Sequence, residues 1–216
     1  MKIEYLGHSC FKLTNSAGIS VVCDPYSDEI GYKMPKVEAD AVTVSHRHFD
    51  HDCVRNVSNN PAVFDKEGVF DIHGVKIDSI KSFHDDAQGK KRGENLIFRF
   101  KMDDITVCHL GDLGENCSSR LIEKISAVNV LLIPVGGNYT IDAKTAREYV
   151  EKIKPQIVIP MHYSTADSKI DIDKIDRFLK FFNSDCISEI NKSSLELSPD
   201  VLADNCTKII VLRRAQ

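Results

Sequence analysis

The sequence lacks the features that mark several large classes of protein. It contains no tryptophan, no apolar run near the ~20 residues that a membrane-spanning helix needs, and no basic start followed by an apolar stretch. We therefore expect no membrane span and predict a cytoplasmic location. A basic surplus is also missing, because 28 basic and 32 acidic residues give a net charge of −4. This balance argues against a protein whose main task is to bind nucleic acid.

Cysteine is present, but in no pattern that predicts a disulfide framework or a cysteine-rich zinc site. The seven cysteines are scattered, their number is odd, and no Cys-x-x-Cys pair occurs. Several lie in apolar, strand-like segments, where a thiol behaves as a small hydrophobic group. We predict ordinary core and surface thiols.

The length and the pattern of hydrophobic residues predict a single domain over residues 1–216. Strand-like segments dominate the first half, and strands alternate with helical patterns in the second half. Strands are expected at 2–14, 19–23, 41–45, 75–83, 95–101, 105–108, 128–135, 157–160 and 208–212, and helices at 118–126, 142–154 and 173–183. Two sheets packed face to face, with helices outside, would accommodate this order.

One short segment carries the pattern of a metal site. His46 and His48 follow the apolar segment 41–44, and an extended backbone directs side chains two residues apart to the same side. Asp50 and His51 come next, where the chain must turn. Neutral imidazole and carboxylate groups suit zinc, manganese or iron. This loop could therefore supply two adjacent metal ions, the first through His46 and His48 and the second through Asp50 and His51.

Three more residues of the same chemical types each follow an apolar segment. His84 comes after 80–83, Asp112 after 107–111, and His162 after 157–161. Sites are normally built on the loops that follow strands. Each residue alone is weak support, because a single histidine or aspartate at a strand end is usually structural or solvated. Together with the histidine cluster, they would supply the remaining ligands for two metals.

Taken in order, these motifs resemble those of the metallo-β-lactamase superfamily. They are Asp24, His46-x-His48-x-Asp50-His51, His84, Gly111-Asp112 and His162, and the opening Tyr5-Leu6-Gly7-His8 and the segment 134–143 extend the similarity. The chain is similar to a small single-domain branch, to which L-ascorbate 6-phosphate lactonase and N-acyl phosphatidylethanolamine phospholipase D are more distantly related. The resemblance implies an α+β fold, a four-layer αββα sandwich with its site at one edge of the sheets.

The resemblance also implies a ligand set for two divalent metals. By position, the first metal would be held by His46, His48 and His84, the second by Asp50, His51 and His162, with Asp112 as the bridge. Zinc is expected, with manganese or iron as alternatives. Members that hydrolyse β-lactams often have cysteine at the position of Asp112. The aspartate resembles the glyoxalase II, ribonuclease Z and phosphodiesterase branches instead, so antibiotic hydrolysis is not expected.

Three further polar residues are candidates for supporting roles. His109 could be mistaken for a ligand of the first metal, but we favour His84, because a ligand so close to Asp112 would crowd one loop. His109 would then support the ligands, and Asp24 would accept a hydrogen bond from a ligand histidine and fix its tautomer. His8 either lines the pocket or is a plain strand residue.

The predicted function is hydrolysis of a small molecule by a hydroxide held between two metals, with Asp50 or Asp112 handling the proton. A phosphodiester or other phosphate ester is favoured, with a lactone or thioester as the alternative. The cluster Lys90-Lys91-Arg92 could reach an anionic substrate, although a solvated loop is the simpler interpretation.

Two alternatives come from other functional classes. One is a di-iron redox protein, which the lack of a flavodoxin-like domain disfavours. The other is a non-catalytic metal-binding protein, which the full ligand set disfavours. The oligomeric state is not indicated by the sequence.

Overall fold

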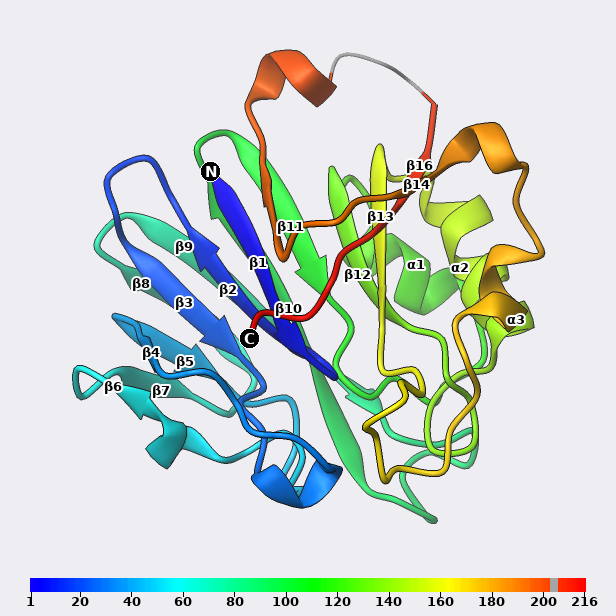
Figure 1. Cartoon of the computed structure of the whole chain (residues 1–216), viewed down its shortest axis with the longest axis horizontal. Coiled ribbons are helices and arrows are strands. Elements are labelled where there is room, and N and C mark those ends of the chain that lie inside the picture. The colour runs from blue at the N-terminus through cyan, green and yellow to red at the C-terminus, as the bar shows by residue number, and fades with distance from the viewer. Residues whose placement is uncertain (203–205) are drawn as a thin grey trace.

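Two β-sheets form the framework of the protein, and the computed structural model describes residues 1–202 and 206–216. The first sheet has six strands in the order β15-β1-β2-β3-β5-β7 (Figure 1). Their bounds are Lys2–Gly7 for β1, Cys10–Thr14 for β2, Ser20–Cys23 for β3, Ala41–Thr43 for β5, Ala62–Phe64 for β7 and Ser194–Glu196 for β15. A separate parallel pair joins β4 (Val37–Glu38) to β6 (Val57–Ser58).

The second sheet has eight strands in the order β14-β16-β13-β12-β11-β10-β9-β8. Their bounds are Gly68–Ile72 for β8, Val75–Phe83 for β9, Glu94–Met102 for β10, Ile105–His109 for β11, Val130–Pro134 for β12, Ile157–Met161 for β13, Ile187–Glu189 for β14 and Lys208–Val211 for β16. Strands β12 and β13 are buried along their whole length, as expected for parallel strands covered on both faces.

The apolar core lies between the two sheets and continues beneath the helices. Phe11 of the first sheet packs in one cluster with Phe98 and Phe100 of the second. A second cluster, which includes Tyr149 and Phe178, joins the helices to the outer face of the second sheet. Figure 1 shows α1 (Ser119–Ile125), α2 (Ala143–Ile153) and α3 (Asp176–Leu179) gathered on that face.

A thinner layer covers the outer face of the first sheet. Val42 of β5 packs there against Tyr26 and Ile30, which belong to the loop and 3₁₀ helix at Asp28–Ile30. Further 3₁₀ helices lie at Val54–Asn56, Ser184–Cys186 and Pro199–Leu202. The layered α+β sandwich predicted from the sequence is confirmed.

The local sequence determines where helix α2 begins and ends and which face it buries. The Asp142 carboxylate accepts a hydrogen bond from the Thr145 N–H at 2.8 Å, which caps the first turn. The buried positions recur at helical spacing and include Ala146, Tyr149, Val150 and Ile153. The helix ends at Lys154, which adopts the left-handed conformation before a proline.

Strand direction gathers the predicted site residues at one edge. Strands β1 and β3 point the same way because both are antiparallel to β2, and β5 is parallel to β3. Strands β11, β12 and β13 are parallel, and β9 shares their direction because β9 and β11 are both antiparallel to β10. The carboxyl ends of these strands are followed by His8 (β1), Asp24 (β3), the loop 45–51 (β5), His84 (β9), Asp112 (β11) and His162 (β13). Sheet edges of this kind are common ligand sites.

Several sequence predictions differ from the structure in detail. The segment 2–14 is two strands, because Gly7 and His8 have positive φ values and turn the chain. The helix predicted at 173–183 is regular only over Asp176–Leu179. Four short strands at the sheet margins (β7, β8, β14 and β15) were not predicted, because their side chains are largely half-buried or exposed and carry little periodic signal.

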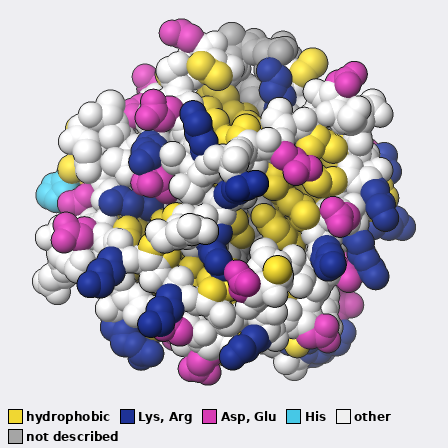
Figure 2. Space-filling model, viewed as in Figure 1, with side chains coloured by type: hydrophobic (Ala, Val, Ile, Leu, Met, Phe, Trp, Pro, Cys, Tyr) yellow, Lys and Arg dark blue, Asp and Glu magenta, His cyan; other side chains and the backbone are white. Residues whose placement is uncertain are grey.

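Charges of both signs are mixed on the face seen in Figure 2. Lysine and arginine side chains are interspersed there with aspartate and glutamate, and apolar side chains appear between them. This mixture fits the small net charge of −4. Among the described residues, we find no helix with both the length and the apolar character needed to cross a membrane. The seven cysteines are free thiols, and Cys10, Cys23, Cys53 and Cys108 are buried.

Candidate metal centre

The Asp112 carboxylate lies at the centre of a group of imidazole nitrogens. Its Oδ1 is 3.1 Å from His51 Nε2. Its Oδ2 is 3.3 Å from His162 Nε2, 3.5 Å from His84 Nε2 and 3.8 Å from His46 Nε2. These histidines come from the loop after β5 and from the ends of β9 and β13, so three separate segments converge on one carboxylate.

Two groups of possible ligand atoms lie close to this carboxylate. His46, His48 and His84 each offer an atom within 4.8 Å of the others, as do the four residues His8, Asp50, His51 and His162. A third group with the same spacing consists of His46, His51 and Asp112, which connects the first two. The structure thus brings together all seven residues predicted as ligands and adds His8.

Asp24 orients one histidine directly. The Asp24 Oδ2 atom is 2.8 Å from His51 Nδ1. Because a carboxylate only accepts hydrogen bonds, Nδ1 carries the donated hydrogen. The Nε2 atom of His51 is therefore the one that faces Asp112. Both side chains are fully buried.

Asp24 orients a second histidine through Ser45. Asp24 accepts hydrogen bonds from the Ser45 N–H at 2.8 Å and from the Ser45 hydroxyl at 2.6 Å. The hydroxyl hydrogen is thereby used, so the Ser45 oxygen accepts from His46 Nδ1 at 3.0 Å. His46 then directs Nε2 to the centre. One carboxylate thus orients a histidine in each group. Ser45, which supports His46, was not predicted from the sequence.

His8 lies against Asp50 rather than in the core of its sheet. Its Nε2 is 3.1 Å from Asp50 Oδ2, and its ring centroid is 4.3 Å from that of His162. The His8 carbonyl accepts hydrogen bonds from the His162 N–H at 3.0 Å and the Tyr5 hydroxyl at 3.1 Å. These contacts join the β1–β2 turn of the first sheet to the end of β13 in the second.

His109 uses both of its ring nitrogens away from the centre. Its Nδ1 accepts a hydrogen bond from the Gly111 N–H at 3.1 Å, and its Nε2 lies 2.8 Å from the Ser9 carbonyl, to which it donates. These partners define a neutral ring with its hydrogen on Nε2. His109 therefore offers no free nitrogen to a metal and instead braces the turn that carries Asp112.

Three site residues hold unusual backbone conformations. His8, Asp24 and His162 have φ values of 53°, 46° and 51°, in the left-handed region. Such conformations cost of order 1–3 kcal/mol each and concentrate at functional sites, where surrounding contacts enforce them. All three residues directly follow a strand. The sharp turn lets the His8 and His162 side chains face the centre and lets Asp24 contact His51 Nδ1.

Asn95 fixes the backbone that carries Asp112. Its side-chain oxygen accepts from the Asp112 N–H at 2.9 Å, and its amide group donates to the Leu110 carbonyl at 3.0 Å and to Ser82 Oγ at 2.8 Å. A Cβ at Gly111 would lie 2.4 Å from the Asn95 oxygen, so this turn requires glycine. The sequence analysis did not single out Asn95, since its role depends on the pairing of β10 with β9.

Replacing Asn95 by leucine will therefore destabilise the metal-free protein. The change leaves the Asp112 N–H and the Leu110 carbonyl buried without their partner, at a cost of about 1–3 kcal/mol each. We expect a loss of about 2–5 kcal/mol in the free energy of unfolding, measured by urea denaturation. Asn191→Leu, at an exposed position, is the control. Equal stability of Asn95→Leu and the wild type would show that this amide does not hold the turn.

Burial and pairing shift the proton affinities of the site in opposite directions. Burial lowers the pKa of His8 to about 4 and that of His46 to about 3. Burial also acts on His51, but the carboxylates of Asp112 and Asp50 outweigh it and raise its pKa. Burial disfavours the charged form of Asp112, yet the nearby His162 and His51 hold its pKa well below the usual range. The ionised Asp112 carboxylate and the neutral His46 ring are in the state that metal ligation requires, whereas His51 would release its proton when a metal binds.

The metal-free protein will lose stability as the pH falls from about 6.5 to about 4. In this window the unfolded chain takes up protons on His8 and His46, whereas the folded chain does not. Each histidine contributes at most about 1.4 kcal/mol per pH unit. His51, with its raised pKa, contributes a constant term there because it is protonated in both states. Urea denaturation of the chelated protein measures the slope, which His8→Gln should reduce and His73→Gln, at an exposed turn, should not.

The donor set fits divalent metal ions. Among the described residues, His46 Nε2 is a buried atom without a hydrogen-bond partner. His51 Nε2 and Asp112 Oδ1 also lack a hydrogen bond, since they lie 3.1 Å apart without the alignment that one requires. Buried polar atoms are normally satisfied, so this group of orphaned atoms needs a ligand. Imidazole nitrogen with carboxylate oxygen is the donor chemistry of zinc, manganese and iron sites.

One cavity adjoins the centre, and a second cavity lies next to the first. The first, of about 560 Å³, is lined by His46 and His48 together with Arg47, Lys66 and Arg92 among others. The other has a volume of about 580 Å³ and shares the lining residues Glu67 and Lys81 with the first.

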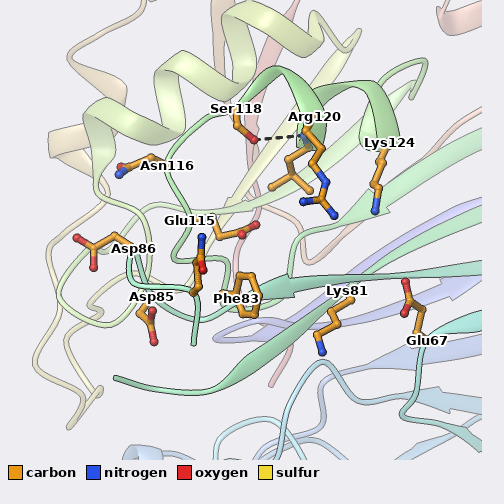
Figure 3. A pocket seen from close by; sticks show the side chains of 12 residues that line it. Glu67, Lys81, Phe83, Asp85, Asp86, Glu115, Asn116, Ser118, Arg120 and Lys124 are labelled. Carbon is orange, nitrogen blue, oxygen red and sulfur yellow. Dashed lines mark hydrogen bonds between the residues drawn. The ribbon is translucent and has the colours of Figure 1, made fainter. Parts of the chain in front are cut away.

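Figure 3 shows the second cavity, where Arg120 and Lys124 extend from α1 above the strand that carries Lys81. Acidic side chains, including Glu115 and Asp86, line it as well. It contains none of the site histidines, so the cavity beside His46 and His48 is the candidate substrate cavity.

Comparison with known proteins defines the class. A family model described as a beta-lactamase superfamily domain matches residues 2–162, and the chain belongs to this family. UPF0173 metal-dependent hydrolases from Desulforamulus reducens and Carboxydothermus hydrogenoformans are 31% and 30% identical over 196 residues. In both cases the match covers 76% of this chain and 85% of the relative.

A crystal structure from Thermotoga maritima shares the whole fold. It is described as a candidate zinc-dependent hydrolase of the metallo-β-lactamase superfamily, and it is 37% identical with a TM-score of 0.79. The match covers 98% of this chain and 97% of that one. The superfamily that the motifs predicted is confirmed, and the protein is a metal-dependent hydrolase.

Proposed function

We propose that this hydrolase uses two metal ions and acts on a phosphodiester or another phosphate ester. His46, His48 and His84 would hold the first ion, and Asp50, His51 and His162 the second, with the Asp112 carboxylate between them. The observation that carries this proposal is the position of Asp112, within 3.1–3.8 Å of imidazole nitrogens from both groups. Zinc is the proposed metal, supported by the description of the Thermotoga maritima relative as zinc-dependent.

The bound metals would supply Lewis acidity, which lowers the pKa of water toward neutrality and stabilises negative charge on the substrate. The remaining steps depend on the chain's own groups. Asp50 is ionised, since His51 and a hydrogen bond from His8 outweigh the effect of burial and lower its pKa. Asp50 or Asp112 could therefore accept the proton of the attacking water and pass it to the leaving group.

The supporting residues would keep these groups oriented during turnover. Asp24 holds the ring of His51 directly and that of His46 through Ser45, so neither ring needs to reorganise when the substrate binds. His8 limits the rotation of the Asp50 carboxylate. Such preorganisation accounts for a large share of the rate enhancement in sites of this kind.

The choice of a phosphate ester is supported by the cations around the candidate substrate cavity. Arg47, Lys66, Lys81 and Arg92 line it, alongside the acidic Asp65, Glu67 and Glu94. No carboxylate among the described residues lies within ion-pair distance of Arg92, so its charge is available to a substrate. A phosphate ester keeps its negative charge throughout the reaction, whereas a lactone or thioester is neutral at the reacting carbon. An anionic substrate would therefore gain more from this surface.

A side-by-side turnover assay tests the proposal. The protein reconstituted with zinc or with manganese, and a chelated control, would be given an aryl phosphodiester, an aryl phosphomonoester and a lactone. We expect chelator-sensitive cleavage of a phosphate ester. Cleavage of the lactone alone would favour the acyl hydrolase alternative. Two bound metals without cleavage of any ester would contradict the proposed substrate class.

A further inference from the structure

Arg92 has an arrangement that its basic neighbours lack. It lines the same cavity as His46 and His48. Its guanidinium carbon lies 4.6 Å from the ring centroid of Tyr139, and its Nη2 lies 3.5 Å from the Asn138 carbonyl. No carboxylate among residues 1–202 and 206–216 lies within ion-pair distance of it. A guanidinium stacked on an aromatic ring keeps its hydrogen-bonding edges available.

Of the other cations that line this cavity, two are already paired. Arg47 forms an ion pair with Asp65, and Lys81 with Glu94. Lys91, next to Arg92, lies 2.6 Å from Asp86. Among the described residues, Lys66 has neither an ion-pair partner nor a stacked aromatic ring.

The loop that carries Arg92 is built by one carboxylate. Asp85 Oδ1 accepts hydrogen bonds from the N–H groups of Ala87 at 2.7 Å and Gly89 at 2.9 Å. Asp85 Oδ2 accepts from the N–H groups of Lys91 at 2.9 Å and of Arg92 itself at 2.8 Å. Asp85 directly follows His84, one of the proposed ligands, so the loop holds Arg92 in a fixed relation to the metal centre.

We propose that Arg92 binds an anionic group of the substrate separate from the bond that is hydrolysed. The substrate would then carry a carboxylate or a phosphate group in addition to the ester at the metals. The planar guanidinium can donate two parallel hydrogen bonds to either group. This inference deepens the proposed function and rests on it, because the cavity is taken as the substrate cavity.

Binding of dicarboxylates tests this role without requiring turnover. The probes are malonate, succinate and glutarate, each compared with its monoamide, on zinc-loaded protein whose metal content is measured. One carboxylate would occupy the metal centre, and the other would reach Arg92. We expect at least one diacid to bind roughly tenfold or more tightly than its monoamide in the wild type, as a charge-assisted pair allows.

Two variants locate the preference. It should disappear in Arg92→Gln and persist in Lys90→Gln, which is exposed and does not line the cavity, with zinc content unchanged in both. A diacid preference that survives in Arg92→Gln, or that is absent from the wild type, would overturn the proposal. A preference that follows Arg92 without hydrolysis of any phosphate ester would sustain this inference while the proposed substrate class fails. Hydrolysis of a phosphate ester without the diacid preference would support the proposed function and overturn this inference.

Discussion

Asp112→Asn will bind fewer metal ions than the wild type and lose on the order of 10³-fold or more in kcat/KM. The amide has nearly the same size as the carboxylate, so the turn held by Asn95 and Gly111 should remain. What disappears is the negative charge that faces imidazoles of both groups, at 3.1 Å from His51 Nε2 and 3.5 Å from His84 Nε2. Metal content by mass spectrometry and turnover of the best ester measure the two effects.

Asp71→Asn is the matched control for this change. Asp71 accepts a hydrogen bond from the Gly74 N–H at an exposed turn of the β8–β9 hairpin. It should retain both metals and full activity. Wild-type activity in Asp112→Asn would contradict the central position given to this carboxylate.

Asp24→Asn will weaken metal binding by about 10–100-fold, although Asp24 lies outside the proposed ligands. An asparagine side chain can accept from the Ser45 N–H through its oxygen, but its amide nitrogen cannot accept from His51 Nδ1. His51 would then no longer be fixed with Nε2 toward Asp112, and His46 would lose its indirect support. Competition with a chromophoric chelator measures both metal affinities.

Ser45→Ala tests the support of His46 separately from the support of His51. It removes the hydroxyl that links Asp24 to His46 at 3.0 Å but leaves the direct contact to His51 at 2.8 Å. We expect weakening at the first metal alone, whereas Asp24→Asn should weaken both. Unchanged affinity for both metals in Asp24→Asn would show that these hydrogen bonds do not orient the ligands.

The proposed ligand residues could be selected from the sequence because the signal was local. His46, His48, Asp50 and His51 lie in one short loop after a strand, and their spacing alone indicated a metal site. His84 and His162 needed one more step, since each follows an apolar strand. Strands that point the same way end at the same edge of a sheet, so strand-end residues far apart in sequence could converge.

The contacts of the supporting residues could not be anticipated in the same way, although His8, Asp24 and His109 were candidates. His8 reaches Asp50 only because a left-handed turn after β1 directs it out of the first sheet. Asn95 reaches the Asp112 backbone only because β10 pairs with both β9 and β11. Strand pairing and turn geometry of this kind leave no periodic pattern along the chain.

For Arg92, the sequence left two interpretations open. The cluster 90–92 suggested contact with an anionic substrate but also fitted a solvated loop. The structure separates its members, since Lys91 pairs with Asp86 and Arg92 stacks on Tyr139 beside the histidine-lined cavity. The difference depends on the hydrogen bonds of Asp85, which sequence composition does not reveal.

Anomalous diffraction at the zinc edge, from crystals of the zinc-loaded protein, tests the two-metal centre most directly. We expect two peaks on opposite sides of the Asp112 carboxylate. One should lie among His46, His48 and His84, and the other among Asp50, His51 and His162. A single peak, or peaks away from Asp112, would contradict a centre in which this carboxylate joins two metal ions.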